Sequence, residues 1–484
     1  MVDRMWLLAL AFVMAAGPAV AQVPGRDGLR PDSLPPLPDT LRLYGEAIVV
    51  RAELPDLNPL PGAVFLSLDD AIRLALEQSP GLGIAVAEVE RAENDATRGN
   101  AGFLPTVDAN AQLGGFSSLD TGTGDSTGAS TSAVTNLTGD VTLGYTLFDG
   151  FRRNATLRRL RAEAERLGLT AEAQAEALAF AVTAAYLDVI RQEALVVAFQ
   201  EAVAISEDRL RIASAEVEIG TAAEIDAALA LADLNADRAA LLRQAVALAQ
   251  ARATLGALLA LPDPEAVATT DTLTLGPPPN LAALAVRAEE ENRRVRALEV
   301  GEVAAREAVR EVRAEFSPAI RVLAGVGASA LDRGLFPANV PAFGTDVRYG
   351  LSATVPLFDA GDRRRRVANA EIRVRQAELA TEDEQVGLRA DVARLAASVE
   401  GFRQLAALET QSRAVARQNV RVALAQFQLG LITPIDLRQV QLALLDAEGR
   451  MIEAVYNARR AEAELRFLAG DLLPKDAFVP EERE

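Results

Sequence analysis

The sequence predicts a mixed α/β membrane protein, built as an internal tandem duplication and completed by other copies of the same chain. Three observations predict this class: landmarks recur about 210 residues apart, each half switches its hydrophobic period from helix to strand and back, and only four strands are present. The strands, of roughly ten residues each, match an outer-membrane signature, but the smallest such barrels need about eight strands. The missing strands must come from other copies, and three copies give twelve.

Composition excludes several function classes. The 484 residues include no Cys and no His, so a disulfide, a thiolate nucleophile, a Cys/His zinc site and a Ser-His-Asp triad are all impossible. A formal charge of −19 disfavours nucleic acid as a partner, because binding phosphates needs a basic surface. We therefore expect no catalytic residues, no cofactor and no metal. The abundance of Ala, Leu, Glu and Arg is typical of long helices.

The N-terminus has the features of an export signal. Asp3 and Arg4 precede an apolar run, and Ala19-Val20-Ala21 forms a cleavage site of the A-x-A type. Residues 1–21 are therefore predicted to be a signal peptide. Residues 22–65 form a Pro-rich extension, which is either an extended strap or a disordered lead.

The duplication is defined by landmarks that keep their order and spacing. Phe103-Leu104-Pro105 recurs as Phe316-Ser317-Pro318 at an offset of 213, and Leu147-Phe148-Asp149-Gly150 recurs as Leu357-Phe358-Asp359-Ala360 at an offset of 210. The first repeat covers residues 66–275 and the second covers 276–470, followed by a short acidic tail at 471–484. Chance similarity between Ala- and Leu-rich helices does not explain landmarks of this kind.

Each repeat is predicted to contain a helix, two strands and a long helical hairpin. The first repeat has a helical pattern over 68–99, then alternating strands around Val107 to Leu113 and Val141 to Leu147. Strands around Ile320 to Val326 and Val347 to Val355 follow in the second repeat. From Asp149 and Asp359, which we expect to be N-caps, about 68 to 70 residues run without proline, which amounts to roughly 100 Å of helix. A turn at Gly220 or Gly430 and a returning helix complete each hairpin.

These landmarks carry a family resemblance. The Leu-Phe-Asp-Gly start of a long helix, the duplicated layout and the Gly-x4-Ile-Asp turns resemble the TolC-like outer membrane efflux protein family over residues 66 to 470. The resemblance implies a homotrimer with a twelve-stranded β-barrel in the Gram-negative outer membrane, continuous with a long periplasmic α-helical barrel. It also implies an exit duct of a tripartite efflux pump or type I secretion system. The partners implied are a periplasmic adaptor (membrane fusion) protein, an inner-membrane transporter and outer-membrane lipid.

In that family the turns of the two hairpins lie at the periplasmic entrance. The resemblance therefore assigns adaptor docking to the turns that contain Gly220, Thr221, Gly430 and Leu431. It assigns the channel gate to residues that follow or precede them: Asp436, Gln439, Asp226 and Phe427. Gln439 stands where the family has a second gate aspartate, Phe427 where it has a tyrosine and Ile432 where it has an arginine. For both aspartates the alternative is an ordinary residue at a helix N-terminus.

Two other function classes remain open from the sequence. A periplasmic coiled-coil scaffold accounts for the helices and predicts solubility without detergent. A barrel enzyme would have to rely on carboxylates alone. Neither alternative explains both the duplication and the incomplete barrel, and the cargo is not specified by the sequence.

Overall fold

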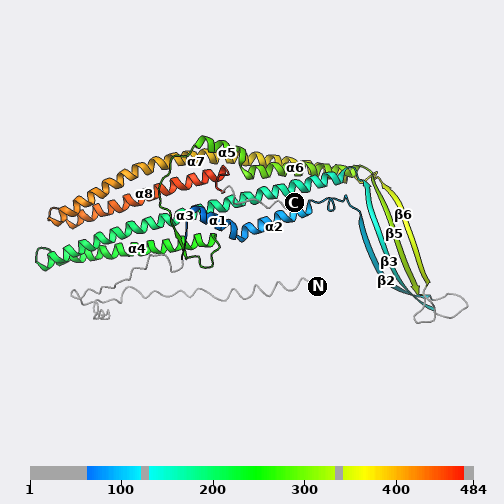
Figure 1. Ribbon diagram of the computed structural model, residues 1–484, viewed down its shortest axis with the longest axis horizontal. Helices are drawn as coiled ribbons and strands as arrows, with labels where there is room; N and C mark the ends of the chain where they lie inside the picture. Colours follow the sequence, from blue (N-terminus) through cyan, green and yellow to red (C-terminus); the bar gives the residue numbers. More distant parts are fainter. Residues whose placement is uncertain (1–62, 121–129, 333–341, 474–484) are drawn as a thin grey trace, which may run out of the picture. The chain divides into compact units, whose positions relative to one another are not determined.

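The structure is a computed structural model that describes residues 63–120, 130–332 and 342–473. The expected signal peptide, almost all of the Pro-rich extension and the tail from residue 474 lie outside the described residues. The described part contains two long helical hairpins, shorter helices packed beside them, a four-stranded sheet and a small two-stranded sheet (Figure 1).

Three of the four helices in each half have the same lengths in both halves, and the second differs. The first repeat has helices of 11, 16, 67 and 35 residues: α1 (Leu68–Gln78), α2 (Pro80–Asp95), α3 (Arg152–Glu218) and α4 (Glu224–Leu258). The second has helices of 11, 21, 67 and 35 residues: α5 (Leu281–Glu291), α6 (Arg293–Arg313), α7 (Asp362–Gln428) and α8 (Pro434–Leu468). A 3₁₀ turn, η4 (Ala314–Phe316), follows α6.

The helix expected over 68–99 is two helices, and so is its counterpart. Ser79 ends α1 in an extended conformation and caps α2, whose first residue is Pro80. Proline fits the first turn of a helix but disfavours helical backbone in the residue before it. In the second repeat Asn292 makes the break, and its Oδ1 accepts from the backbone N–H of Arg294 (3.1 Å) and Val295 (3.2 Å). The periodicity continues across both breaks, so periodicity alone did not reveal them.

The expected N-caps Asp149 and Asp359 lie just before the helices that they cap. The residues at the N-cap position are Phe151 (φ 65°) and Gly361 (φ 86°), both left-handed. The Asp carboxylates still serve the helix, because Asp149 Oδ2 accepts from the Arg153 N–H (3.2 Å) and Asp359 Oδ2 from the Arg363 N–H (3.0 Å).

Four strands form one antiparallel sheet in the order β2-β3-β5-β6. They are β2 (Thr106–Asp120), β3 (Ser130–Phe148), β5 (Ala319–Asp332) and β6 (Ala342–Thr354). At 13 to 19 residues they are longer than the ten expected. The register is regular apart from a bulge between Thr146 and Phe148. Within the described residues, β2 and β6 are edge strands with one neighbour each.

The structure also contains a two-stranded sheet that the sequence did not predict. β1 (Val64–Leu66) and β4 (Val267–Thr269) pair in parallel and tie the start of the first repeat to its end. Buried Tyr186 of α3 fixes this pair, because its hydroxyl donates to Leu66 O (2.9 Å) or Asp271 Oδ2 (2.8 Å). Strands of three residues carry no detectable alternation.

The largest core cluster lies in the first repeat, where α1, α3, α4 and β4 meet around residues such as Val182 and Leu255. α3 contains an 18-residue window that is apolar and long enough to cross a bilayer, but half of that window is buried inside the chain. Its apolar character is therefore explained by packing within the protein.

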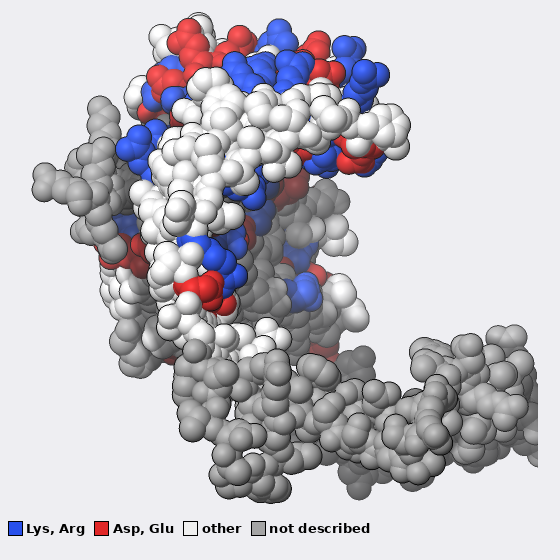
Figure 2. Space-filling model, turned by 90° about the vertical axis from the view of Figure 1, so that its right-hand side faces the viewer, with Lys and Arg blue, Asp and Glu red and all other residues white. Residues whose placement is uncertain are grey.

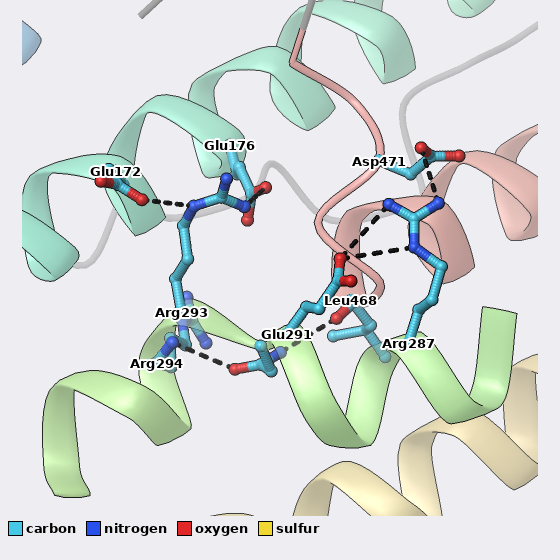
Figure 3. Close-up of polar contacts among 9 residues, drawn as sticks. Glu172, Glu176, Arg287, Glu291, Arg293, Arg294, Leu468 and Asp471 are labelled. Atoms are coloured by element: carbon cyan, nitrogen blue, oxygen red, sulfur yellow. Dashed lines mark hydrogen bonds and ion pairs between the residues drawn. The ribbon is translucent and has the colours of Figure 1, made fainter. Parts of the chain in front are cut away.

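The break at Asn292 belongs to a polar joint between α3, α5, α6 and the end of α8 (Figure 3). Arg293 bonds to Glu172 (2.7 Å) and to Glu176 of α3, while Asn292 Nδ2 donates to Leu468 O (3.1 Å). Burial raises the pKa of Glu176 to about 7, against the opposing effect of Arg293. This joint fixes the second repeat to the first in the first half of α3.

Candidate functional site

The two hairpin turns have the same backbone geometry. Gly220 (φ 79°) and Gly430 (φ 70°) end α3 and α7 in the left-handed conformation. The next N–H reaches back five residues in each case, from Thr221 to Glu216 O (2.8 Å) and from Leu431 to Gln426 O (2.9 Å). These are Schellman motifs, which need glycine because a Cβ disfavours positive φ. Both turns end a 67-residue helix that starts at the sheet, so they lie about 100 Å of helix away from it.

Apolar side chains are exposed around both turns. Leu431 is 69% exposed and Thr221 is also exposed. The exposed apolar residues on either side of the two glycines are Ile219, Ile225, Leu429 and Ile435. Exposed apolar residues grouped at a helix end are typical of a protein contact surface.

Both candidate gate aspartates cap the returning helices. Asp436 Oδ2 accepts from the Thr433 N–H (3.1 Å) and hydroxyl (2.6 Å), and Thr433 Oγ1 in turn accepts from the Asp436 N–H (3.2 Å). These bonds hold the pKa of Asp436 below its ordinary value. Asp226 Oδ2 likewise accepts from the Ala223 N–H (3.2 Å), but alanine offers no hydroxyl to return the bond. Asp436 is exposed and Asp226 is half-buried.

The other two gate candidates differ in exposure. Gln439 is exposed on the first turns of α8. Phe427 is 4% exposed and packs with Ala423 and Leu437, against Ile212 of the first hairpin. The Phe427 ring therefore packs between the two hairpins.

A buried ionic network close to the turns was not anticipated from the sequence. Arg438 of α8 makes a two-pronged contact with Asp237 of α4, at 2.7 and 2.8 Å. Ser206 of α3 donates to the same carboxylate, and Arg209 of α3 contacts Asp233 of α4 and, at 3.4 Å, Gln441 of α8. The network, which we call the hairpin network, comprises Ser206, Arg209, Asp233, Asp237, Arg438 and Gln441. It links the two hairpins two to three turns above the tip of the second.

The sheet has one apolar and one polar face. Register places Val107, Leu143, Ala324 and Tyr349 opposite one another on the first face. On the other face, Asp108 lies opposite Thr142, and Asp140 lies opposite Gly327, which lies opposite Asp346. The apolar face is open, since the exposed large residues include Leu113, Leu137, Val141, Val326, Val347 and Leu351. In Figure 2 few charged side chains lie along the strands, whereas both signs gather at the upper end of the view.

Arginines at the strand-to-helix junction have local partners that offset the unfavourable helix dipole. Arg153 donates to the carbonyls of Thr146 (2.7 Å) and Leu147 (3.1 Å) and lies over the Phe103 ring. Arg363 repeats this role with Glu315 O (3.4 Å) and Phe316. These contacts brace α3 against the end of β3 and α7 against the 3₁₀ turn η4.

Long helix α7 carries an exposed apolar seam. Ile372, Leu379 and Val386 are each more than half exposed and recur every seven residues. A second set with the same spacing, shifted by one residue from the first, is formed by Leu408, Val415, Val422 and Leu429, the last at the end of the helix. A seven-residue apolar repeat is the pattern by which one helix packs along another. Within the described residues, no helix covers this seam.

The comparisons with known proteins agree with this architecture. The family model described as "Outer membrane efflux protein" matches residues 71–261 and 284–471, which is well over half of the chain and covers both repeats separately. The chain therefore belongs to the outer membrane efflux protein family. It is a TolC-like channel protein of the Gram-negative outer membrane, with helices that extend into the periplasm.

Several solved structures share the fold at low sequence identity. The outer membrane protein VceC from Vibrio cholerae is 19% identical, with a TM-score of 0.69 over 83% of this chain and 96% of that one. The Campylobacter jejuni CmeC outer membrane channel is 14% identical, with a TM-score of 0.71 over 84% and 86% of the two chains. The open state of the Neisseria gonorrhoeae MtrE outer membrane channel is 21% identical, with a TM-score of 0.68 over 85% and 91%. No functionally curated protein matches the sequence significantly.

Proposed function

We propose that three copies of this chain form the exit duct of a tripartite efflux pump or type I secretion system. The four-stranded sheets of the copies close a twelve-stranded barrel in the outer membrane, and their helices form a tube in the periplasm. The observation that carries this proposal is the sheet itself, because an open apolar face, a polar face and two unpaired edges fit a segment of a lipid-embedded barrel.

The proposed partners follow from the two ends of the chain. Lipid covers the apolar face of the sheet. A periplasmic adaptor docks on the hairpin turns at Gly220, Thr221, Gly430 and Leu431, where exposed apolar side chains meet a rigid backbone. An inner-membrane transporter supplies the energy and the cargo, which passes along the polar interior. The seam on α7 supports the helical tube, since a neighbouring copy would cover it.

The gate is proposed at the same end of the tube. Copies of Asp436 brought together near the axis would form a carboxylate ring, which attracts cations and repels anions. Asp226 and Gln439 flank that ring, and Phe427 with the hairpin network sets how far each second hairpin can move from the first.

Two adjacent residues of β3 test the membrane assignment. Leu137 faces the apolar side and Thr138 the polar side, so Leu137→Arg places a charge in lipid and Thr138→Arg places the same charge in the lumen. An arginine on the lipid face costs about 2–4 kcal/mol at the bilayer midplane. Leu137→Arg should deplete the protein from outer-membrane fractions, whereas Thr138→Arg should be retained. Equal retention of both variants would argue against a lipid-facing sheet.

A further inference from the structure

Equivalent residues of the two repeats pair in the same way within the sheet. In the first hairpin of strands Thr106 pairs with Gly144. Adding the repeat offsets, 213 for the first strand and 210 for the second, gives Ala319 and Thr354. Those two residues do pair in the second hairpin. The offsets therefore convert a strand pair of one repeat into the equivalent pair of the other.

The contact between the repeats can be converted in the same way. Within the chain β3 of the first repeat pairs with β5 of the second, for example Val141 with Val326 and Leu143 with Ala324. The residue of β6 equivalent to Val141 is Leu351, and the residue of β2 equivalent to Val326 is Leu113. β6 and β2 are the two unpaired edges of the described sheet, so they cannot make this contact within one chain.

We propose that the contact between the two repeats recurs between neighbouring copies, so that β6 of one copy pairs antiparallel with β2 of the next, with Leu351 opposite Leu113 and Ala353 opposite Ala111. This inference rests on the proposed ring of copies and adds the residue-level register of its joints. The occupant of each free edge is a second copy of this chain.

The side chains fit this register. Leu351 and Leu113 are 69% and 72% exposed, and the register covers each with the other. Ser352 comes opposite Gln112 and Thr354 opposite Asn110, so the apolar and polar faces continue unbroken across the joint. A slip of one residue would set Leu351 against Gln112 and reverse the faces. Tyr349, 88% exposed, comes opposite Gly115, where its ring has room to lie over the neighbouring strand.

The helices independently support a contact between copies that repeats the contact inside the chain. Ala162 of α3 is 6% exposed near the Arg158–Glu307 contact between α3 and α6, and its equivalent on α7 is Ile372, which is 55% exposed. On α6, Ala297 is 8% exposed, and its equivalent on α2 is Ile84, which is 65% exposed. Buried positions of the internal contact are thus matched by open, larger apolar residues on the surfaces that a neighbouring copy would cover.

The equivalence between the internal contact and the contact between copies holds for the strands. It does not hold for the turn that joins the second strand of each repeat to its long helix. Gly150 has room only for a hydrogen, because a Cβ there would lie 2.4 Å from Ser317 Cβ. Its equivalent is Ala360, so the corresponding turn of the neighbouring joint must be more open. We therefore test the register within the strands.

Cysteine pairs measure the register directly, because the native chain has no cysteine. The matched variants are Ala353→Cys with Ala111→Cys and Ser352→Cys with Gln112→Cys, which sample both kinds of antiparallel pair. The displaced variant is Ala353→Cys with Val107→Cys, four residues or about 13 Å out of register. Leu143→Cys with Ala324→Cys is the equivalent pair within one chain and serves as the positive control.

After oxidation in membranes, at least one matched variant should give about tenfold more disulfide-linked dimer and trimer than the displaced variant, because a disulfide needs Cα atoms within about 7 Å. Preferred cross-linking of the displaced variant would overturn the register. So would failure of both matched variants when the internal pair closes. If the protein still conducts and has the mass of three chains, that failure contradicts the register alone, whereas a monomer that does not conduct contradicts the proposed function as well.

Discussion

Asp436 caps the start of α8 and is also proposed to form a carboxylate ring at the gate. A matched control variant separates these two roles. Asp70 of α1 has a similar capping geometry, since its Oδ2 accepts from the Ser67 hydroxyl at 2.6 Å, as Asp436 Oδ2 does from the Thr433 hydroxyl. Loss of either carboxylate removes the same helix cap. Only Asp436 lies at the hairpin tip.

In planar bilayers, Asp436→Ala should raise the conductance or weaken the cation preference, whereas Asp70→Ala should do neither. The bonds from Thr433 hold the pKa of Asp436 below its ordinary value, which favours the charged carboxylate at neutral pH, so the cation preference should be present there. If the two variants conduct alike, Asp436 is only a helix cap and the constriction lies elsewhere on α8.

The hairpin network should contribute more to the free energy of unfolding than any ion pair on the surface. Asp237 is 5% exposed and receives bonds from Arg438 and Ser206, so Asp237→Ala leaves the partly buried Arg438 guanidinium with only the Asp233 carboxylate, 3.9 Å away. Breaking a buried pair in this way costs about 3–5 kcal/mol, against 0–1 kcal/mol for an exposed pair. The exposed pair Arg211–Asp208 in α3 provides the control.

We expect Asp237→Ala to lower the thermal midpoint and to speed amide exchange in the first turns of α4 and α8. Asp208→Ala should leave both measurements close to the native values. Near the tips, this network is the main polar link between the hairpins in the described residues. If Asp237→Ala and Asp208→Ala have the same thermal midpoint and amide exchange, the hairpin network does not stabilise the contact between the hairpins.

The hairpin turns are the element on which the proposed adaptor contact depends. A cysteine at Thr221 or Leu431 should cross-link to the cognate adaptor in cells, because both side chains are exposed beside a fixed glycine turn. A cysteine at Leu137, on the apolar face of the sheet, should not. Cross-links from Leu137 in place of the turns would contradict this placement.

The elements differ in how well the sequence predicted them. The 67-residue helices were predictable because neither Arg152–Glu218 nor Asp362–Gln428 contains a proline, and the turns were marked by glycine. The breaks at Ser79 and Asn292 were missed because apolar spacing continues through them. The hairpin network was missed for a different reason: Arg209 and Gln441 lie 232 residues apart, and no local pattern relates them. The family resemblance pointed to the hairpin turns as the functional end. Only the packing in the structure revealed the hairpin network that links the two hairpins.

At the scale of the whole molecule, the duplication explains why one chain is incomplete. Each repeat offers one strand edge and one helical face to the next repeat, and the first and last of these surfaces remain open in a single chain. Such surfaces close only in a ring, which is the usual way that symmetric oligomers satisfy a head-to-tail contact. Membrane insertion and assembly are therefore expected to be coupled.

The mass of the detergent-extracted protein tests this account most directly. Native mass spectrometry should give three chains, each of 51.3 kDa less the signal peptide if it is removed, together with a circular dichroism spectrum dominated by helix. A stable, folded monomer in plain buffer without detergent would contradict the account, because it would leave the apolar sheet face, both strand edges and the α7 seam exposed to water.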